Sequence, residues 1–392
     1  MKVRLGEVFN LQMGKTPSRA NAEYWADGEN SWVSIADLSG YSKYVGDTKE
    51  RITDLAVQES GIKLVPADTV IMSFKLSLGK TAITKDPVYT NEAIMAFLPT
   101  GKYDVCTDYF FHLFSGRDWS KGTNRAVMGA TLNKETLSNL EIDVPSLEKQ
   151  RRIAAVLDKV SDLIAKRRAQ LDKLDELVKA RFVEMFGDPY INSMAWKKIK
   201  IKAAVTVEPQ NGMYKPQSDY VTDGSGIPIL RIDGFYDGAV TDFSSLKRLR
   251  CNDNEKQKYL LNENDIVINR VNSIEYLGKC AHITGLIEET VYESNMMRMH
   301  FDPVRFNPVY VTHLLCSRFV YDQVINHAKK AVNQASINQK DVLDFDIYQP
   351  SIERQNVFAD FVNRADQSKL TIQQSLDKLE ILKKALIQEY FG

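Results

Sequence analysis

The strongest constraint in this sequence is a segment that occurs twice. Residues 130–187 return as residues 335–392, shifted by 205 positions without a gap, and 18 of the 58 aligned positions are identical. Pro-Ser-Leu-Glu-Lys-Gln at 145–150 becomes Pro-Ser-Ile-Glu-Arg-Gln at 350–355, and Leu-Asp-Lys-Leu at 171–174 returns at 376–379. A gapless register of this length predicts that the chain builds the same scaffold element twice.

Each copy is expected to form one long helix. Pro145 ends the preceding segment, Ser146 can act as the N-cap, and Glu148 places negative charge near the positive end of the helix dipole. Gly187 stops the first helix, and the second runs to the last residue. Some forty residues at 1.5 Å per residue give a helix of roughly 60 Å, far longer than an average globular helix. Such a helix needs a partner, and its own copy is the obvious one.

Apolar side chains recur in both copies at alternating three- and four-residue steps, which is the heptad spacing of a coiled coil. We therefore expect the two helices to pack antiparallel along this seam, with Arg167, Arg181 and Lys383 as its polar exceptions. The seam residues are Val160, Ile164, Leu171, Leu174, Val178, Ile372, Leu376, Leu379 and Leu386. A solvated charged helix or a generic dimerising coiled coil is the alternative, and the globular segment of similar size before each copy argues against it.

Length and composition indicate a folded protein of two domains. A chain of 392 residues exceeds one ordinary core, and 44% hydrophobic with 26% charged residues is typical of globular proteins. No apolar run is long enough to cross a bilayer, and Met1 to Arg4 lead into no signal-peptide core. We therefore expect no membrane association and a cytoplasmic location.

Cysteine spacing and net charge narrow the function classes. The four cysteines contain no Cys-x-x-Cys pair, so neither a zinc ribbon nor a disulfide framework is indicated, and a reducing cytoplasm fits best. Lys+Arg and Asp+Glu both number 51, so net charge gives no argument for nucleic acid. A DNA-binding face would have to be a local patch balanced by acidic residues elsewhere.

The predicted order is domain, helix, domain, helix, with boundaries at 1–145, 146–187, 188–349 and 350–392. Short apolar runs at 32–35, 69–72 and 93–97 alternate with turn signals and predict strands in a mixed α/β domain, and 108–115 predicts a short buried helix. The second domain follows the same plan more faintly, with 227–232, 265–270 and 309–315 at the corresponding places. The expected fold class is α+β, with two globular domains, two long antiparallel helices and a pseudo-twofold internal repeat.

This layout resembles the specificity subunit of type I restriction-modification systems over the whole chain. The passages into the two helices, Phe-Gly-Asp-Pro at 186–189 followed by Trp196, and the openings at 5–8 and 14–17 are similar to that family's junctions. The second domain departs from the pattern, because Ala203-Ala204-Val205 stands where a small-residue turn is usual. Its first DNA-facing loop is therefore harder to place.

The resemblance implies a division of labour between subunits. Such a chain reads double-stranded DNA through two target-recognition domains and does no chemistry itself. Two modification subunits, docked on its helices, supply S-adenosylmethionine and methylate adenine, while restriction subunits supply the ATP-driven motor and nuclease. We accordingly expect no cofactor on this chain, with S-adenosylmethionine, ATP and Mg²⁺ on the partner subunits.

Three motifs suggest chemistry and are better explained as structure. Gly-Lys-Thr at 14–16 and 79–81 resembles the end of a P-loop, but the glycine required five residues earlier is Phe9 or Phe74. Asp188-Pro189-Tyr190 resembles an adenine methyltransferase tetrapeptide but lacks its second proline and any glycine-rich cofactor loop. His112 and His313 are related by the repeat, yet neither has a histidine at metal-ligand spacing. The sequence therefore predicts neither a catalytic nor a metal site.

Base edges in the major groove are read by Arg or Lys at guanine and by Asn or Gln at adenine, and other polar contacts position the backbone. Loops that carry such side chains beside Gly or Ser are the candidate DNA contacts, although any single member could also be an exposed residue that touches nothing. Arg231 and Arg270 flank apolar strands and could instead be salt-bridged structural residues. The candidates are Lys15, Thr16, Ser18, Lys75, Ser77, Lys80, Asn124 and Arg125 in the first domain, and Tyr214, Lys215, Gln217, Arg231, Asn269, Arg270, Asn272, Lys329, Lys330, Asn333 and Gln334 in the second.

The hypothesis that unites these observations is bipartite DNA reading, with one half-site per domain and the helices setting the gap between them. Two other classes stay open at this point. One is an enzyme, such as a nuclease or methyltransferase, hidden in a divergent segment; metal- or cofactor-dependent activity of the isolated chain would favour it. The other is a scaffold that spaces two protein-binding modules, which salt-insensitive protein binding without DNA affinity would favour.

Overall fold

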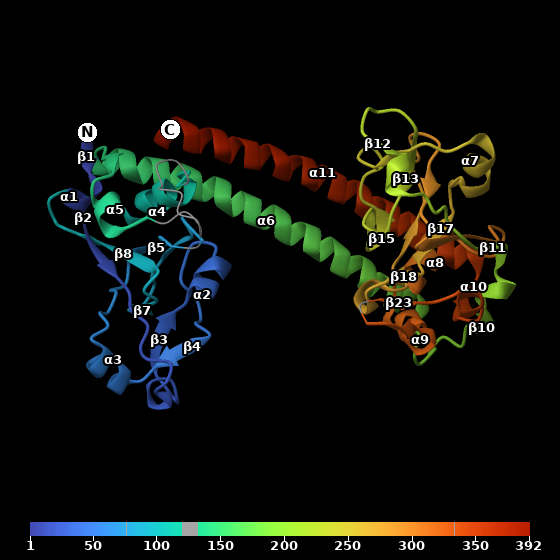
Figure 1. Cartoon of the computed structure of the whole chain (residues 1–392), viewed down its shortest axis with the longest axis horizontal. Coiled ribbons are helices and arrows are strands. Elements are labelled where there is room, and N and C mark those ends of the chain that lie inside the picture. Colours follow the sequence, from blue (N-terminus) through green and yellow to red (C-terminus); the bar gives the residue numbers. More distant parts are fainter. Residues whose placement is uncertain (76, 120–131, 333) are drawn as a thin grey trace. The chain divides into compact units, whose positions relative to one another are not determined.

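The computed structural model describes residues 1–75, 77–119, 132–332 and 334–392, and these residues form two compact units. Unit 1 comprises Met1–Ala169 with Gln373–Gly392, and unit 2 comprises Gln170–Ile372. The long helices α6 (Leu147–Phe186) and α11 (Ile352–Phe391) each contribute residues to both units (Figure 1). The α+β fold class, with two globular domains and two long helices, is confirmed.

Unit 1 is built around a small antiparallel sheet with the strand order β2-β8-β5-β6. A second sheet, in the order β4-β3-β7, pairs β3 and β7 in parallel, and β1 pairs with β9 immediately before α6. Its elements are β1 (Lys2–Arg4), α1 (Leu5–Val8), β2 (Phe9–Met13), η1 (Ala22–Tyr24), β3 (Asn30–Val33), α2 (Ile35–Gly40), β4 (Glu50–Ile52), α3 (Asp54–Ser60), β5 (Val70–Ser73), β6 (Thr81–Ile83), β7 (Tyr89–Thr90), β8 (Ile94–Pro99), α4 (Thr107–Gly116), α5 (Lys134–Ser138) and β9 (Glu141–Asp143).

Unit 2 repeats this plan with insertions (Figure 1). The order β11-β21-β17-β19 corresponds to β2-β8-β5-β6 and is extended by β15 and β14, while β13 and β20 form the parallel pair. Its elements are β10 (Lys197–Lys200), η2 (Ile201–Ala203), β11 (Val205–Asn211), η3 (Gln217–Asp219), β12 (Tyr220–Val221), β13 (Ile227–Leu230), β14 (Phe235–Tyr236), β15 (Gly238–Val240), β16 (Arg248–Leu249), α7 (Asp253–Tyr259), β17 (Ile266–Asn269), β18 (Val271–Asn272), η4 (Ile274–Tyr276), β19 (Cys280–His282), β20 (Val291–Tyr292), β21 (Met296–Phe301), α8 (Pro308–Leu315), α9 (Arg318–His327), β22 (Lys329–Lys330), β23 (Ala335–Ser336), α10 (Gln339–Leu343) and β24 (Asp346–Gln349).

The correspondence between the domains, inferred from faint sequence similarity, is therefore confirmed element by element. The segments at 227–232 and 265–270 form β13 and β17, which occupy the places of β3 and β5. The predicted buried helix at 108–115 is α4, and its counterpart at 309–315 is α8. All four elements are largely buried, which explains their apolar runs.

A buried glutamine joins each domain to the helix that follows it. Gln150 and Gln355, both with 0% exposure, lie in the first turns of α6 and α11. The Gln150 side chain accepts from the Cys106 N–H at 2.8 Å and donates to the Asp104 and Pro145 carbonyls, both at 2.9 Å. Gln355 makes the same three bonds, with Asn307, Arg305 and Pro350. Each glutamine side chain accepts a hydrogen bond from a backbone N–H at the start of α4 or α8 that has no partner within its own helix. Gln150 thereby fixes α6 against α4, and Gln355 fixes α11 against α8.

Each unit packs the start of one long helix near the end of the other, so the two helices run antiparallel. In unit 1, Leu157 of α6 lies in the core against which Leu386 and Phe391 of α11 pack. In unit 2, Phe182 lies 5.5 Å from Phe358, ring centre to ring centre. Ion pairs join the helices as well, Arg168 with Glu380 at 2.7 Å in unit 1 and Asp175 with Lys369 at 2.6 Å in unit 2.

All nine predicted seam residues are buried or partly buried, as the heptad pattern requires. Burial is deepest near the globular domains, as at Val160 and Val178, and only partial around Leu171 and Leu174. Two of the polar exceptions, Arg181 and Lys383, are partly buried in the seam. The Arg181 guanidinium pairs with Glu184 at 2.8 Å. Burial lowers the pKa of Lys383. The predicted coiled-coil packing is confirmed within each unit.

The first long helix ends as its sequence predicts. Gly187 follows Phe186 with φ of +77°, the left-handed conformation in which glycine avoids a Cβ clash. The Trp196 indole N–H donates to the Phe186 carbonyl at 2.9 Å, and the Arg354 Nε donates to the Met185 carbonyl at 2.8 Å. The Phe-Gly-Asp-Pro junction with its following tryptophan is thus a helix stop. Among the described residues, no helix is both long and apolar enough to cross a membrane.

His313 makes the stability of unit 2 depend on pH. Its ring lies 5.2 Å from that of Phe358, and burial lowers its pKa to about 4, with Asp366 and Lys369 as the charged neighbours. In the unfolded chain a histidine has a pKa of about 6.5. Below that pH the unfolded state takes up a proton that the folded state refuses, so stability falls as the pH drops from about 6.5 towards 4.

We predict that this effect costs about 2 kcal/mol at pH 5 relative to pH 7. Urea unfolding of the wild type and of His313→Gln at both pH values measures it. The variant should lose that much less stability on acidification, since it has no proton to take up. The matched control, His327→Gln at the exposed end of α9, should follow the wild type. Parallel pH dependence in wild type and His313→Gln would refute the assignment.

Candidate nucleic-acid interface

The topology of the central sheet brings two of the predicted loops together in each unit. In unit 1, β2 and β5 both pair antiparallel with β8, so the residues after them flank the start of β8. The described loop residues 14–18, 74–75, 77–80 and 91–93 therefore lie at one edge of the sheet, called edge 1 below. In unit 2, β11 and β17 flank β21 in the same way. Residues 212–217, 270–279 and 293–295 form the corresponding edge 2.

Backbone hydrogen bonds confirm that the two edges are built alike. Lys15 N donates to the Thr90 carbonyl at 2.8 Å, and Met213 N donates to the Tyr292 carbonyl at the same distance. Phe74 N donates to the Ala93 carbonyl at 3.0 Å, and its counterpart Arg270 donates to Asn295 at 2.8 Å. These bonds fix where the side chains of each loop start.

A glycine opens the first loop at both edges because the backbone there leaves no room for a side chain. A Cβ added at Gly14 would overlap the Thr90 and Asn91 carbonyls, and one at Gly212 would overlap those of Tyr292 and Glu293. Gly212 therefore marks the first loop of the second domain, which the sequence pattern around Ala203 did not reveal. Ala203 itself ends η2, before β11 begins.

In the first loop of edge 1 the polar side chains are partly engaged. The exposed Lys15 ammonium donates to the Ser60 carbonyl, and Thr16 donates to Glu92 while accepting from Asn91 at 3.0 Å. Ser18 is exposed, and its carbonyl accepts from the Trp25 indole at 3.2 Å. Lys15 and Ser18 can reach a ligand, while Thr16 is mainly a loop-fixing residue.

The second loop of edge 1 presents its side chains more openly. Ser77 and Lys80 are exposed, and Lys75 is partly exposed with its ammonium 5.2 Å from the Phe74 ring. Ser73 holds the turn together by bonding to both the Ser77 and Lys80 backbones. The remaining candidates of this domain, Asn124 and Arg125, lie outside the described residues.

In the first loop of edge 2, Tyr214 is 80% exposed and Gln217 is exposed, so both can reach a ligand. Lys215 is engaged with Glu255 at 2.8 Å and with Asp219 at 3.6 Å. Arg231 donates to the Tyr220 hydroxyl at 3.4 Å and lies 3.7 Å from Asp233. The structural alternative for Arg231, a salt-bridged residue, is the one that the geometry favours.

Asn269 cannot serve as a base-contacting residue in this fold. Its side chain, the last in β17, is completely buried and its amide points to the Tyr276 carbonyl at 3.4 Å. The sequence suggested it as a DNA contact because the polar residues Asn269, Arg270 and Asn272 come at the end of the apolar run at 266–268. The expectation for Asn269 is therefore wrong, since the strand extends one residue further than the apolar pattern.

The other candidates of edge 2 are gathered by a small sheet with the order β18-β23-β22. Asn272 pairs with Ala335, which pairs in turn with Lys330, and Arg270 donates to the Ser294 carbonyl at 3.1 Å. Lys329, Lys330 and Gln334 are exposed, and Val332 at the hairpin tip is 98% exposed. Asn333 lies outside the described residues. The hairpin therefore projects basic and amide side chains beside edge 2.

Sequence reasoning missed one residue that the structure singles out. Lys279 occupies the position of Lys80. Each lysine follows a glycine with left-handed backbone conformation. The carbonyl of each also accepts a hydrogen bond at 2.8 Å from the backbone N–H of the last residue of the preceding strand, Ser73 for Lys80 and Asn269 for Lys279. Its ammonium lies 3.8 Å from the centre of the Tyr236 ring and donates to the Ile232 carbonyl at 2.8 Å, and burial lowers its pKa. The Gly-Lys pair at both 79–80 and 278–279 was the available signal.

Acidic residues also take part in edge 2. Glu293 is buried, accepts from the Ile232 N–H at 2.6 Å, and has its pKa raised by burial. Its second oxygen lies 4.0 Å from Arg231. This carboxylate fixes the segment that joins the loops of edge 2.

The sequences that resemble P-loops serve other purposes here. Gly14-Lys15-Thr16 follows β2, and Gly79-Lys80-Thr81 turns into β6, so neither leads into the helix that a P-loop requires. A Cβ at Gly79 would overlap the Trp119 ring, and its φ of +79° is left-handed. Both glycines thus serve close packing and turn formation.

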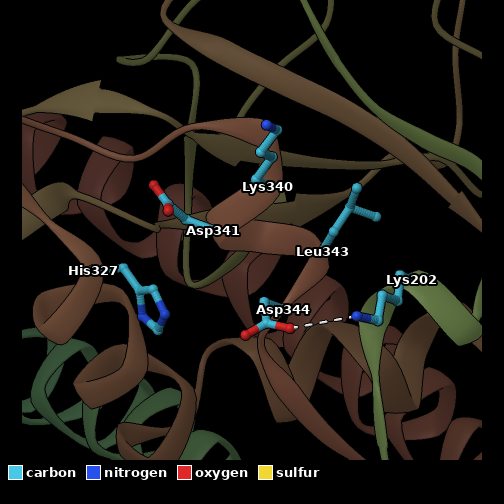
Figure 2. Close-up of a pocket in the computed structure, with 6 residues that line it drawn as sticks. All are labelled: Lys202, His327, Lys340, Asp341, Leu343 and Asp344. Atoms are coloured by element: carbon cyan, nitrogen blue, oxygen red, sulfur yellow. Dashed lines mark ion pairs between the residues drawn. The ribbon is translucent and has the colours of Figure 1, made fainter.

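A cavity of about 430 Å³ lies at the other end of β11 from Gly212 (Figure 2). Lys202, Lys340, Asp341, Asp344 and His327 line it, and Lys202 approaches Asp344 at 3.6 Å. Asp341 is committed to the N-terminus of α10, where it accepts from the Asn338 N–H. The lining contains two lysines and two aspartates, so this cavity offers no excess positive charge for a phosphate.

Comparison with known proteins agrees with this architecture. A family model described as the type I restriction modification DNA specificity domain matches residues 1–174. The type I restriction enzyme MjaIX specificity subunit of Methanocaldococcus jannaschii is 28% identical over 287 residues, which cover 68% of this chain and 65% of the relative. The EcoR124I/EcoR124II specificity subunit of Escherichia coli is 30% identical over 168 residues, 41% of this chain and 40% of the relative. The aligned parts thus span less than two thirds of these relatives.

Solved structures share the fold over the full length. The S subunit of a type I restriction-modification system from M. genitalium has a TM-score of 0.60 at 12% identity, covering 100% of this chain and 96% of that one. A chain from work on complex assembly and conformational transition of the type I R-M system has a TM-score of 0.63 at 17% identity, covering 100% and 97%. The resemblance inferred from the sequence is therefore confirmed: residues 1–174 match the type I restriction modification DNA specificity domain, and the chain shares its fold with S subunits of known structure.

Proposed function

We propose that this chain reads a bipartite, gapped DNA target, with edge 1 facing one half-site and edge 2 the other. The observation that carries the proposal concerns the two equivalent sheets. Each unit gathers its predicted loops at the corresponding edge of its own central sheet. A protein that recognises two different half-sites needs two such surfaces. They should share the same backbone arrangement and differ in the side chains that contact the DNA. Edge 1 offers Lys15, Lys75 and Lys80, whereas edge 2 offers Tyr214 and Gln217 with the hairpin that bears Lys329 and Lys330.

The same proposal assigns the long helices two tasks. They hold the two units at a fixed separation, so helix length sets the gap between the half-sites. Their outward faces dock two modification subunits, which methylate adenine, and restriction subunits join that complex. The large apolar side chains that such docking would cover are exposed along both helices: Leu163, Leu177, Val183, Val357, Leu370, Ile381 and Leu382.

The chain itself is proposed to be non-catalytic and to act in the cytoplasm. S-adenosylmethionine, ATP and Mg²⁺ belong to the partner subunits in this scheme. Methylation specificity, rather than turnover by the isolated chain, is therefore the readout that tests it.

The decisive experiment maps methylated bases in genomic DNA at single-base resolution, in cells with and without this chain and in the presence of the modification subunit. We expect adenine methylation at one gapped motif that disappears when the chain is absent. That result also gives both half-sites and the gap. If no methylated motif depends on the chain, the DNA-reading function is wrong and a protein scaffold takes its place.

Salt dependence tests the assignment of the hairpin beside edge 2. Each phosphate contact that is lost lowers the slope of log affinity against log salt concentration by about one. The double variant Lys329→Ala with Lys330→Ala, assembled with its modification subunits, should lower that slope by about two without changing the methylated motif. The control pair Lys102→Ala with Lys197→Ala removes exposed lysines away from the edges and should leave the slope unchanged. Equal slopes for both variants would remove the hairpin from the interface.

Helix length tests the spacing role. Deleting residues 169–175 of α6 together with residues 371–377 of α11 removes one heptad from each helix and keeps the heptad pattern of both in phase. Seven residues correspond to about 10 Å, roughly three base pairs of B-DNA. We expect a methylated motif with a shorter gap, or loss of methylation. Alanine at the exposed positions Asp172 and Lys173, without a change in length, is the control. Methylation at the original gap after the deletion would end the spacing hypothesis.

A further inference from the structure

Two of the four cysteines meet in unit 2, although 36 residues separate them in the sequence. Cys280 is the first residue of β19 and is completely buried, and Cys316 follows the last turn of α8 at an exposed position. Their sulfur atoms lie 3.3 Å apart, and the Cys280 sulfur lies 3.9 Å from the Thr312 carbonyl. A covalent disulfide has a sulfur separation of about 2.05 Å, so closing the pair requires a movement of roughly 1.2 Å.

Unit 1 provides an internal reference for this pair. Thr81 opens β6 as Cys280 opens β19, and Ser115 lies in the last turn of α4, three residues after His112, as Cys316 lies three residues after His313. Thr81 and Ser115 line one cavity, so the equivalent residues of unit 1 also lie near each other. The fold therefore accepts hydroxyls at these two places. Unit 2 carries thiols at both places, and these add a chemistry that hydroxyls lack.

The surroundings distinguish the two thiols. The hydrogen bond from Cys280 lowers the pKa of Cys316, and the same contact with burial raises the pKa of Cys280. Burial and the Asp237 carboxylate act in the opposite direction on the pKa of Cys316 and are outweighed by that hydrogen bond. Cys316 is thus the sulfur that carries negative charge more readily, and it lies at the accessible end of a helix. The thiolate is the form that reacts with oxidants.

We propose that Cys280 and Cys316 are a redox-active dithiol that closes to an intramolecular disulfide when the protein meets a peroxide. The Cys316 thiolate sulfur attacks one peroxide oxygen, the O–O bond breaks, and hydroxide leaves, which gives the sulfenic acid of Cys316. The Cys280 sulfur then attacks the Cys316 sulfur, so the S–S bond forms, the S–O bond breaks, and the Cys280 proton leaves with the oxygen as water. In total, two thiols and one hydrogen peroxide give one disulfide and two water molecules.

The bond would join two elements beside edge 2. Cys280 directly follows the turn that contains Gly278 and Lys279, and Cys316 lies against the turn at Gly238, where an added Cβ would lie 3.6 Å from its sulfur. A small thiol donor, or any other dithiol, reverses the bond by thiol-disulfide exchange. The site is argued from unit 2 alone and does not depend on what the chain binds.

The test treats the reduced full-length chain with one equivalent of hydrogen peroxide, traps the remaining thiols by alkylation, and maps the peptides by mass spectrometry. We expect one linked peptide pair that joins Cys280 to Cys316 and lacks two hydrogen atoms, with Cys106 and Cys251 alkylated. Dithiothreitol should restore four alkylated cysteines. The proposal is overturned if Cys280 and Cys316 stay alkylated while Cys106 or Cys251 is oxidised, or if another pairing dominates.

Variants make the test independent of folding defects. Cys280→Thr with Cys316→Ser installs the residues that unit 1 carries at these places, so the fold should be kept while the linked peptide disappears. Cys316→Ser alone should abolish the link and leave Cys280 alkylated. The matched control Cys251→Ser, at a partly exposed cysteine elsewhere in unit 2, should give the same yield of the Cys280–Cys316 link as the wild type.

Discussion

The structure depends on two long helices, each of which contributes residues to both units. Each buries its first turns in the core of one unit and its last turns in the core of the other. Intrinsic helix propensity alone gives an isolated helix little stability. Most of the stability of these two helices must therefore come from tertiary contacts. Conversely, unit 1 lacks Tyr390 and Phe391 without the end of α11, and unit 2 lacks Phe182 and Phe186 without the end of α6. Each core is therefore completed by residues from the end of the other copy's helix.

That constraint explains why the repeat is strong in the helices and faint in the domains. Residues such as Gln150 and Gln355 serve two elements at once, and every change there leaves a buried amide or a helix N–H unsatisfied. Tyr109 and Tyr310 likewise donate to the Asp143 and Tyr348 carbonyls, which precede the long helices. At the edges a few side chains, such as Ser73 and Glu293, hold the loops, but most of the framing bonds come from the backbone, so the exposed side chains are free to differ.

The parts of the fold that could be predicted from the sequence are those with local or periodic causes. Heptad spacing predicted the seam, Gly187 the helix stop, and apolar runs the strands β5, β13 and β17. The convergence of loops at edge 1 and edge 2 could not be predicted, because it arises from the antiparallel pairing of β8 and β21 with strands far away in the sequence. Asn269 was misjudged because its polar side chain was taken to face a ligand, whereas it is buried. Lys279 was overlooked because the offset between equivalent residues of the two domains is not constant: it is 198 at Gly14, 199 at Lys80 and 205 at the helices.

The two edges also differ in which segments carry their charge. Unit 2 extends its sheet by β14 and β15 and places the three short strands β18, β22 and β23 beside edge 2. The hairpin of β22 and β23 carries exposed Lys329 and Lys330, and in the 205-residue repeat its second strand aligns with residues 130 and 131, outside the described residues. Within the described part of unit 1, positive charge at edge 1 comes from the loops, at Lys15 and Lys80. The two sheets share their strand order while the charged side chains at their edges differ, so each edge can change without disturbing the Gln-anchored helices on which both units depend.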